Sequence, residues 1–587
     1  MHQPATAPSG PIRALVSWTA ALFLLAGFGL RSHAEDYLNL PVVKPIMTCD
    51  QLAKADLSKA ADAPVTIQSV VITDTPAGQF CKVMGNIDPA IIFEVDLPLD
   101  HWTQRFEESP ANSMMIANAG SCAPALHGEF AVAFNNQGHS GKGLMDASWT
   151  PNLQLRIDFA YRANHVTALV AKALIKAFYG QLQQFSYFVG CSEGGREALT
   201  EVQRFPEDFD GVSAGSPIVI DSVHNIFFHP WEAAANKRAD GSRVLVGSRM
   251  GILHDAVLAH CAASAGVLDG VLLEPTACKF DPAWVQCPAG ASDISRCLTA
   301  EEVAVVQKLY KGPGDDAGQH FEISGFPMGT EHRWPLSTAE HIGDRETKEG
   351  FQIRRLLPPP ESDKDTATLE NEFAFTQEWF NKTLALAPLY NAANTNLRAF
   401  QEHGGKLILW NGAEDMTIQP EISVAYYQGV QKELGPELTD KFMRLFLIPG
   451  FGHCGGGDIP FQLDLLTPLM AWTELHRAPA MIVAAKPAAA QEGGILGGPA
   501  GPNGPWAKRY PYAMANQPNQ YTRPVYRFPY IASYKGEGDP NAAESYKPVK
   551  SAAPVPELFD TEATRLIGPD TQKFYRVESG QLVPESK

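Results

Sequence analysis

Ser192 stands in the segment Gly190-Cys191-Ser192-Glu193-Gly194, which has the pattern Gly-x-Ser-x-Gly. A serine that attacks a carbonyl carbon needs its Oγ lifted out of the backbone on a sharp turn, and the flanking positions must be small. The apolar stretch FSYFV (185–189) precedes this motif, and residues 196–204 have helical character. The order of strand, glycine turn and helix therefore predicts that Ser192 is a nucleophile.

Two residues further along the chain have the types that a serine nucleophile needs. A serine hydroxyl is a poor nucleophile without a base, and in α/β-hydrolases the acid and then the histidine follow the serine. Asp415 follows the apolar stretch KLILW and His453 follows MRLFLI, so each stands in a turn after a predicted strand. An aspartate or histidine in a turn is more often structural than catalytic. Three roles in the right order favour the interpretation that His453 is the base and that Asp415 orients it.

The nine cysteines fit an oxidising compartment, where disulfides persist. Sequence alone leaves their connectivity open, and buried free thiols are the alternative. Cys122 is the odd residue, and the spacing of the others suggests three local pairs: Cys49–Cys81, Cys261–Cys278 and Cys287–Cys297.

Two further cysteines flank the candidate nucleophile and base. Cys191 precedes Ser192, and Cys454 follows His453. A disulfide between them would hold Ser192 and His453 within reach of each other, because bridged Cα atoms lie about 5.5–6 Å apart.

The stretches around these residues alternate between strand-like and helix-like patterns. Short apolar stretches bounded by Pro, Gly and Asp are typical of strands, and apolar residues at helical spacing indicate a helix. Residues 489–505 are rich in Gly, Pro and Ala and predict a loop. The sequence predicts helices over residues 158–179 and 196–204, and strands over residues 65–72, 90–97, 113–116, 131–134, 185–189, 406–410 and 443–448.

The chain of 587 residues is too long for one ordinary compact domain. Residues 218–395, called the insertion below, hold many of the cysteines, several Trp and Phe, and the breaker Pro358-Pro359-Pro360. We expect an α/β core in two parts, residues 35–217 and 396–587, with the insertion as a separate domain between them. The last stretch of the chain is expected to wrap back on the core.

The N-terminus has the layout of a signal peptide, residues 1–34. Arg13 precedes an apolar run from Ala14 to Leu30, and Ser32-His33-Ala34 supplies a cleavage site. The run is short for a membrane span of about 20 residues. We therefore expect a secreted or periplasmic protein with no stable membrane association after cleavage. The net charge of −18 argues against a nucleic-acid partner, because nothing would neutralise the phosphates.

Longer stretches of the chain resemble the tannase and feruloyl esterase family, which includes hydrolases of mono(2-hydroxyethyl) terephthalate. The matching stretches are IDFAYRANHVTALVAKALIKAFYG, YFVGCSEGGREALTEVQRFPEDFDGV, NGAEDMTI and IPGFGHCGGG. The resemblance implies an α/β-hydrolase core with a lid domain inserted between nucleophile and acid, a Cys191–Cys454 bridge, and action on esters of aromatic carboxylic acids. It assigns Ser192 as nucleophile, Asp415 as acid and His453 as base.

The loop that binds calcium in this family departs from the family pattern. Relatives read C-D-x-x-D-G-x-x-D-G, whereas residues 261–270 here have alanine at positions 262 and 265 and keep Asp269. Calcium takes about six to eight oxygen ligands, preferably charged ones. We therefore expect no cofactor: the metal site is absent or very weak, with Asp269 as its remaining ligand and Glu274 as a partial substitute.

The expected oxyanion hole is altered as well. The backbone N–H of Glu193 is one expected donor. The family takes the second donor from a glycine-rich loop, and the corresponding residues 117–121 contain a single glycine, Gly120, which is our candidate. Near the C-terminus, Tyr526 and Tyr546 lie close to where relatives have cysteines.

The expected partner is a small aromatic ester, whose acyl group would pass from Ser192 to water. The sequence does not choose among galloyl, feruloyl, chlorogenic and terephthalate-type esters. Two alternatives stay open: an acyltransferase with the same triad, and a non-catalytic binding protein that retains the fold. Four aromatic residues of the insertion are candidate contacts for the acyl ring, although such clusters are more often core: Phe373, Phe375, Trp379 and Phe380.

Overall fold

The structure is a computed structural model that describes residues 36–585, except residues 76, 110–121, 140–147, 316, 323, 335–355, 360, 366–367, 370–371, 460, 488–518 and 552–560. Four sequence predictions lie outside the described residues: the signal peptide over residues 1–34, the strand over residues 113–116, Gly120, and the loop over residues 489–505.

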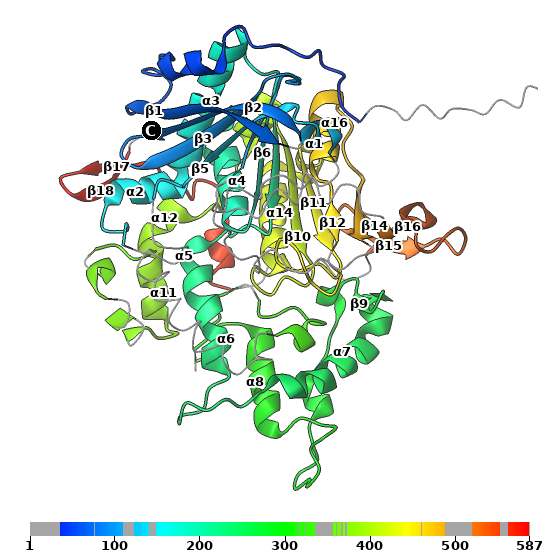
Figure 1. The fold of residues 1–587 in the computed structure, drawn as a ribbon. Coiled ribbons are helices and arrows are strands. Elements are labelled where there is room, and N and C mark those ends of the chain that lie inside the picture. The colour runs from blue at the N-terminus through cyan, green and yellow to red at the C-terminus, as the bar shows by residue number, and fades with distance from the viewer. Residues whose placement is uncertain are drawn as a thin grey trace, which may run out of the picture. The chain divides into compact units, whose positions relative to one another are not determined.

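A nine-stranded mixed sheet forms the centre of the described chain (Figure 1). Its first strands pair antiparallel, and from β5 onward every neighbouring pair is parallel. The order across the sheet is β1 (Val65–Thr75), β2 (Gly78–Ile87), β3 (Ile91–Pro98), β5 (Phe130–Asn135), β4 (Arg105–Glu108), β6 (Phe185–Cys191), β7 (Gly211–Gly215), β10 (Lys406–Gly412) and β11 (Met443–Ile448). The strand predictions that fall on described residues are confirmed. The parallel strands β6, β10 and β11 are buried along most of their length, which explains their continuous apolar runs.

The sequence pattern did not predict β4, whose residues read RFEE. Arg105 is buried and donates two hydrogen bonds to Glu474, from Nε and Nη2, each 2.8 Å long. Burial raises the pKa of Glu107 to about 7 and that of Glu108 well above its ordinary value, which favours their neutral forms. A charged stretch can therefore occupy a central strand, because its charges are paired or suppressed.

Two of the helices that pack on this sheet were predicted from the sequence, over residues 158–179 and 196–204. The predicted helix over residues 158–179 is a π-helical turn, Asp158–Arg162, followed by α3 (Ala163–Tyr179), which ends at the left-handed Gly180. Helix α4 (Glu193–Arg204) contacts β6 and β7, α14 (Pro420–Leu434) contacts β10 and β11, and α16 (Leu466–Leu475) contacts β7 and β10. Shorter helices also belong to this part: α1 (Ala123–Leu126), α2 (Leu153–Ile157), α13 (Arg398–His403) and α15 (Pro436–Thr439).

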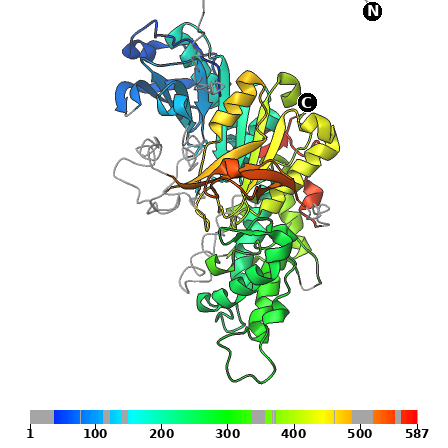
Figure 2. The same cartoon turned by 90° about the vertical axis from the view of Figure 1, so that its right-hand side faces the viewer.

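The chain between β7 and β10 packs as two groups. Residues from Phe228 to Trp334 form an apolar core of their own, whereas residues from Leu356 to Leu397 join the main core beside the sheet. Figures 1 and 2 show α6, α7 and α8 (green) gathered at one end of the sheet strands. The expected boundaries at residues 217 and 395 stay predictions. The regular elements here are α5 (Asp221–Val223), α6 (His229–Ala235), α7 (Met250–Ala265), β8 (Val267–Leu268), β9 (Val271–Leu272), α8 (Ala300–Lys311), α11 (Gln377–Thr383) and α12 (Ala387–Tyr390).

The C-terminal strands form a small sheet with β12 and β13, and two separate hairpins. Strand β14 (Asn519–Tyr526) pairs with β13 (Met481–Pro487), which pairs with β12 (Gln462–Leu463). Two hairpins follow, β15 (Tyr530–Tyr534) with β16 (Tyr546–Lys550) and β17 (Tyr575–Glu578) with β18 (Gln581–Pro584). Within the part of the chain that the structure describes, no helix has the length and apolar character of a membrane span.

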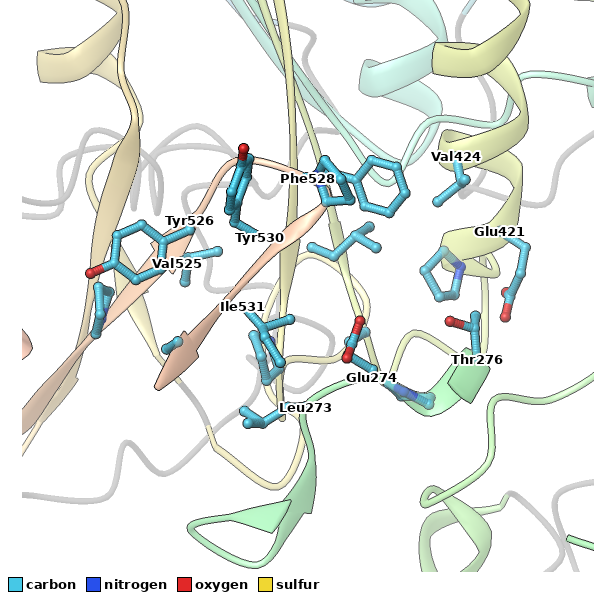
Figure 3. A pocket seen from close by; sticks show the side chains of 18 residues that line it. Leu273, Glu274, Thr276, Glu421, Val424, Val525, Tyr526, Phe528, Tyr530 and Ile531 are labelled. Carbon is cyan, nitrogen blue, oxygen red and sulfur yellow. The ribbon is translucent and has the colours of Figure 1, made fainter. Parts of the chain in front are cut away.

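A small cavity of about 70 Å³ lies where the insertion, helix α14 and the C-terminal residues 524–532 meet. Its walls come from Leu273–Thr276 of the insertion, from the start of α14 and from residues 524–532, as Figure 3 shows. Ligand pockets for drug-sized molecules have volumes of about 300–1,000 Å³, and none of Ser192, Asp415 and His453 lines this cavity. It is therefore a packing gap rather than the substrate site.

Candidate active site

Ser192 lies at the junction of β6 and α4 in a strained backbone conformation. Its φ is 62° and its ψ is −124°, a region that residues with side chains rarely adopt and that is often found at functional sites. The turn is closed so tightly that a Cβ atom at Gly190 would lie 1.9 Å from the carbonyl oxygen of Gly194. The Ser192 N–H donates to the carbonyl oxygen of Gly215 at 2.9 Å. The structure thus contains the strand, sharp turn and helix that the sequence predicted.

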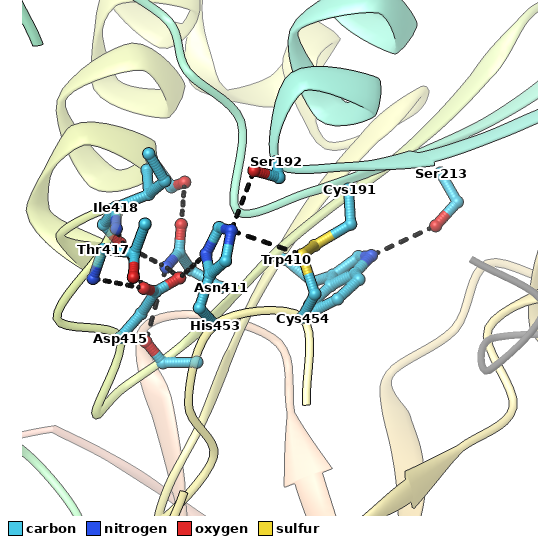
Figure 4. Close-up of a disulfide and its surroundings, with 12 residues drawn as sticks. Cys191, Ser192, Ser213, Trp410, Asn411, Asp415, Thr417, Ile418, His453 and Cys454 are labelled. Carbon is cyan, nitrogen blue, oxygen red and sulfur yellow. Dashed lines mark hydrogen bonds and ion pairs between the residues drawn. A yellow bond between two sulfur atoms is a disulfide. The ribbon is translucent and has the colours of Figure 1, made fainter. Parts of the chain in front are cut away.

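The three residues singled out in the sequence meet in one hydrogen-bonded chain. His453 Nε2 lies 2.8 Å from Ser192 Oγ, and His453 Nδ1 lies 2.9 Å from Asp415 Oδ2 (Figure 4). Asp415 is fully buried, whereas Ser192 and His453 are half-buried. This geometry allows the imidazole to accept the hydroxyl proton while the carboxylate holds the other ring nitrogen.

The carboxylate of Asp415 is fixed by its own loop. Its Oδ1 accepts hydrogen bonds from the N–H groups of Thr417 and Ile418, each 2.9 Å long. Its Oδ2 accepts a longer one, 3.3 Å, from Asn411 Nδ2. Asn411 is in turn held by the hydroxyl of Ser423 at 2.7 Å. Sequence reasoning assigned no role to Asn411, although a side-chain amide four residues before an acid, across a tight turn, is a signal for it.

A disulfide ties the nucleophile turn to the histidine loop. Cys191 and Cys454 are bonded, with a Cα–Cα distance of 6.1 Å. The resemblance implied this pair, and it puts a covalent link beside both Ser192 and His453 (Figure 4). The three local pairs that the spacing suggested are also present: Cys49–Cys81, Cys261–Cys278 and Cys287–Cys297.

The remaining cysteine, Cys122, is a buried thiol. Its Sγ lies 3.6 Å from Met470 Sδ. Burial raises the pKa of the Cys122 thiol well above its ordinary value. It therefore behaves as a small apolar core residue rather than as a nucleophile.

Glu193 is the first residue of α4, so its N–H has no acceptor within the helix. Its carboxylate accepts a hydrogen bond of 2.7 Å from Nε of the buried Arg196. Arg196 also donates to the carbonyl oxygens of Ala160 (2.8 Å) and Phe159 (3.0 Å) in the π-helical turn. This network anchors the first turn of α4 to the core, which fixes the direction of the Glu193 N–H. The second candidate donor, Gly120, lies outside the described residues.

A buried carboxyl group lies one turn further along α4. Glu197 accepts hydrogen bonds from Asn164 Nδ2, at 2.9 Å, and from Gln137 Nε2. Burial, assisted by the charge of Glu193, raises the pKa of Glu197 to about 8. Helix α4 is therefore held against the core by buried hydrogen bonds between Glu197 and the amide groups of Asn164 and Gln137.

The four aromatic residues proposed as ring contacts form one cluster around Phe227, a residue that sequence reasoning did not consider. Ring-centroid distances from Phe227 are 5.5 Å to Phe373, 6.1 Å to Phe375 and 5.7 Å to Phe380. Trp379 lies 5.3 Å from Phe373. Mutual packing of this kind is ordinary for core residues, so their contact with a substrate stays a prediction.

The loop that carries calcium in relatives is a hairpin turn here. Asp269 and Gly270 both have positive φ, 56° and 87°, and connect β8 to β9. The Asp269 carboxylate accepts two hydrogen bonds from Arg523 of β14, 2.8 Å from Nε and 2.9 Å from Nη2. The guanidinium also lies 4.3 Å from the ring centroid of Tyr521. Asp269 therefore already has a cationic partner, and no pattern in the sequence indicated Arg523.

The residues of this loop do not fit a calcium ion. Ala262 and Ala265 offer no side-chain oxygen, and the carboxylate of Asp269 faces a guanidinium. Burial raises the pKa of Glu274, which disfavours its charged form. Among the described residues, no group of three or more His, Cys, Asp or Glu is arranged to hold a metal. Nearby, the Tyr526 hydroxyl donates to the carbonyl oxygen of Tyr546 at 3.2 Å.

Known proteins resemble this chain over most of its length. The model of the family described as tannase and feruloyl esterase matches residues 75–549. An uncharacterised esterase of Xanthomonas campestris is 30% identical and covers 74% of this chain and 84% of its own. A mono(2-hydroxyethyl) terephthalate hydrolase of Piscinibacter sakaiensis is 28% identical and covers 82% and 86%, respectively. A probable feruloyl esterase of Arthroderma benhamiae is 27% identical and covers 79% and 83%.

Solved structures agree with the predicted fold. Feruloyl esterase B of Aspergillus oryzae superposes with a TM-score of 0.67 at 24% identity, over 86% of this chain and 100% of its own. A tannin acyl hydrolase of Aspergillus niger gives 0.61 at 19% identity, over 86% and 96%. These similarities confirm the α/β-hydrolase fold.

Proposed function

Because the chain belongs to the tannase and feruloyl esterase family and is a carboxylic ester hydrolase, we propose that it cleaves esters of aromatic carboxylic acids through an acyl-enzyme on Ser192. The observation that carries this proposal is the continuous hydrogen-bonded chain from Ser192 through His453 to the buried Asp415. The disulfide beside it keeps nucleophile and base within reach.

In the first step, Ser192 Oγ attacks the ester carbonyl carbon while His453 Nε2 accepts the hydroxyl proton. Asp415 stabilises the imidazolium that forms, because its Oδ2 accepts the Nδ1 hydrogen bond. His453 then gives the proton to the leaving alcohol, and the acyl group remains on Ser192. In the second step, water gives a proton to His453 and attacks the acyl carbon. The bond to Ser192 Oγ then breaks, His453 returns the proton to Oγ, and the acid is released.

The tetrahedral intermediates carry a negative charge on the former carbonyl oxygen. We propose the N–H groups of Glu193 and Gly120 as its donors. The start of α4 supports this role for Glu193, because an unpaired N–H and the positive end of the helix dipole both stabilise an anion there. Loss of one such donor typically costs about 10²–10³ in kcat.

The names of the relatives support an aromatic acyl group. Those names include feruloyl esterases and a mono(2-hydroxyethyl) terephthalate hydrolase, whose acids each carry a benzene ring. We propose the same acid class for this chain, with the cluster of Phe373, Phe375, Trp379 and Phe380 as the candidate ring contacts.

We further propose that the protein is exported and needs no calcium. Four disulfides support export, because such bonds persist in oxidising compartments. The ion pair between Asp269 and Arg523 supports independence from calcium, because a guanidinium occupies the carboxylate that a metal would need.

An ester panel tests the proposed function. Methyl ferulate, methyl gallate, chlorogenic acid, mono(2-hydroxyethyl) terephthalate and p-nitrophenyl acetate would be offered to the wild type and to Ser192→Ala. We expect aromatic acids to be released by the wild type only, and a fluorophosphonate probe to label Ser192. Release by both proteins would reject Ser192 as nucleophile, and a preference for the acetate alone would reject the aromatic substrate class. Added alcohol acceptors would reveal transferase activity as new ester products.

A further inference from the structure

The loop that carries Asp415 is held from outside by the insertion. Three successive residues have three different partners: Glu414 receives a hydrogen bond from Arg333, Asp415 bonds His453, and Met416 packs against the apolar core of the insertion. One residue further on, the carbonyl oxygen of Thr417 accepts a hydrogen bond from His224 Nε2 at 2.7 Å. The position of the acid thus depends on contacts from residues 224–334 as well as from its own strand.

Arg333 is a residue of the insertion that contacts both catalytic loops, the loop of Asp415 and the loop of His453. Its Nη1 lies 2.7 Å from Glu414 Oε2, and its Nε lies 3.7 Å from Asp458 Oδ1. Asp458 belongs to the loop that follows His453, and its N–H donates to the same Glu414 oxygen at 3.1 Å. A Cβ atom at Gly452 would lie 3.1 Å from Arg333 Nη2. One guanidinium therefore contacts the loop of Asp415 and Asp458 after His453, and it lies beside Gly452 before His453.

The segment that presents Arg333 is itself anchored. Trp334 is fully buried, and its Nε1 donates to Thr330 Oγ1 at 3.0 Å. Glu331 is fully buried and accepts hydrogen bonds of 2.7 Å from the Tyr310 hydroxyl and from the Gly329 N–H. These neighbours restrict the backbone at Arg333. Its side chain therefore starts from a fixed position and can hold its partners in place.

We propose that Arg333 is a positioning residue for ester hydrolysis: from the insertion, it holds the loops of Asp415 and His453 in register through Glu414 and Asp458. This inference rests on the proposed roles of Asp415 and His453. A misplacement of about 1 Å at catalytic groups can cost about 100-fold in rate. Lysine would not replace arginine fully, because the ammonium lacks the planar fork that contacts two acceptors in fixed directions.

The charges around Glu414 fit this role. Burial and the charge of Asp458 raise the pKa of Glu414 to about 7, while the charges of Arg333 and His254 act in the opposite direction. His332 faces the same group, with its Nε2 2.9 Å from Asp458 Oδ1. His254, whose charge also acts on Glu414, pairs with Glu331: its Nδ1 lies 3.1 Å from Glu331 Oε2. Loss of Arg333 would therefore leave Glu414 and Asp458 close together with less compensating charge.

Arg333→Ala, Arg333→Lys and Arg333→Met test the proposal on the full-length protein. We expect Arg333→Ala and Arg333→Met to lower kcat about 10- to 100-fold with KM within about threefold, because ground-state binding is untouched. Arg333→Lys should keep an intermediate rate, and guanidinium ion at a concentration that leaves the wild type unaffected should restore part of the activity of Arg333→Ala. The matched control is Arg238→Ala, which removes an arginine of the insertion that pairs with Glu301 through two hydrogen bonds of 2.8 and 2.7 Å and should keep the wild-type kcat.

The outcomes separate this inference from the proposed function. If Ser192→Ala and Asp415→Asn lose activity while Arg333→Ala keeps the wild-type kcat, the positioning role is wrong and the triad stands. If Ser192→Ala keeps activity, the triad itself is wrong. Thermal melting and circular dichroism check that each variant is folded. A fall in kcat of Arg333→Ala that neither lysine nor guanidinium relieves, with a melting temperature lowered in proportion, would also overturn the positioning role in favour of a purely structural one.

Discussion

Asp415 and Asp269 both stand in tight turns after a strand, but their partners differ. Asp415 is fully buried, accepts hydrogen bonds from its own loop and from Asn411, and leaves one contact for His453. Asp269 retains 21% of its side-chain exposure and is bound through both oxygens by Arg523. A histidine can gain and lose a proton near neutral pH, whereas a guanidinium keeps its charge. The first pair can therefore move protons, and the second can only hold two segments together.

This difference shows that the partner of a carboxylate decides whether the carboxylate can take part in proton transfer or only stabilise the fold. Each aspartate stands in a loop that resembles a family pattern in the sequence. The loop of Asp415 keeps the rest of its pattern, whereas the loop of Asp269 lacks two of the acidic residues of its pattern. Where Ala262 and Ala265 replace acidic residues, a cation from a distant strand compensates for the remaining charge.

The largest expected effect separates the two aspartates by activity. Asp415→Asn should lower kcat about 10⁴-fold, because the amide favours the wrong imidazole tautomer. Asp269→Asn is expected to keep kcat within about twofold, because it lies outside the proposed reaction path. Steady-state kinetics on an aromatic ester measures both. Similar losses in the two variants would show that the hairpin turn is part of the catalytic machinery.

The disulfides near the two turns should differ in their contribution to stability. The Cys191–Cys454 bond spans 263 residues, whereas Cys261–Cys278 spans 17. In the chain-entropy model, longer loops give more stabilisation, about 5 kcal/mol for the first bond and about 3 kcal/mol for the second. Denaturant unfolding of the two Cys→Ala double variants measures this order, which a larger loss from the shorter loop would contradict.

Glu414 tests whether burial disfavours the ionised form of a carboxyl group in the loop of Asp415. Burial raises the pKa of Glu414 from about 4.5 in the unfolded chain to about 7. The folded state therefore holds this proton more tightly, and the free energy of unfolding should fall as pH rises from 4.5 through 7, by at most about 3 kcal/mol for this group. Glu414→Gln should remove that part of the pH dependence in unfolding measurements at pH 5 and pH 8. An unchanged pH dependence would show that Arg333 compensates the cost of ionisation completely.

The smallest expected effect concerns the ion pair of the hairpin turn. Arg523→Ala should lower the free energy of unfolding by about 1–2 kcal/mol, because two charge-assisted hydrogen bonds are lost at a partly buried site. The exposed pair of Arg238 and Glu301 is the control, with a smaller expected loss because solvent screens an exposed ion pair. A second measurement tests the proposed independence from calcium. The melting temperature of the wild type in EDTA should match its melting temperature without EDTA. A lower melting temperature in EDTA that calcium restores would reverse the interpretation of this loop.

Much of the fold followed from local patterns. Apolar runs and turn residues predicted β1, β3, β5, β6, β10 and β11 and the helices on either side of Ser192, because these elements are decided within a few residues of one another. The strands β2, β4 and β7 of this sheet were not predicted. In β4, burial favours the neutral forms of Glu107 and Glu108, and Arg105 has its partner in a helix 369 positions away. No local pattern distinguishes such a strand from an exposed one.

By itself, the sequence determined which residue types stand after which strands, and therefore the order of Ser192, Asp415 and His453. Their hydrogen bonds, the support from Asn411, and the contacts of Arg333 and Arg523 were decided by the tertiary structure alone. In the sequence, both arginines look like ordinary surface residues, since their partners lie 81 and 254 positions away. A turn is specified by its neighbours in the chain, whereas the partner of a charge is specified by packing between distant segments.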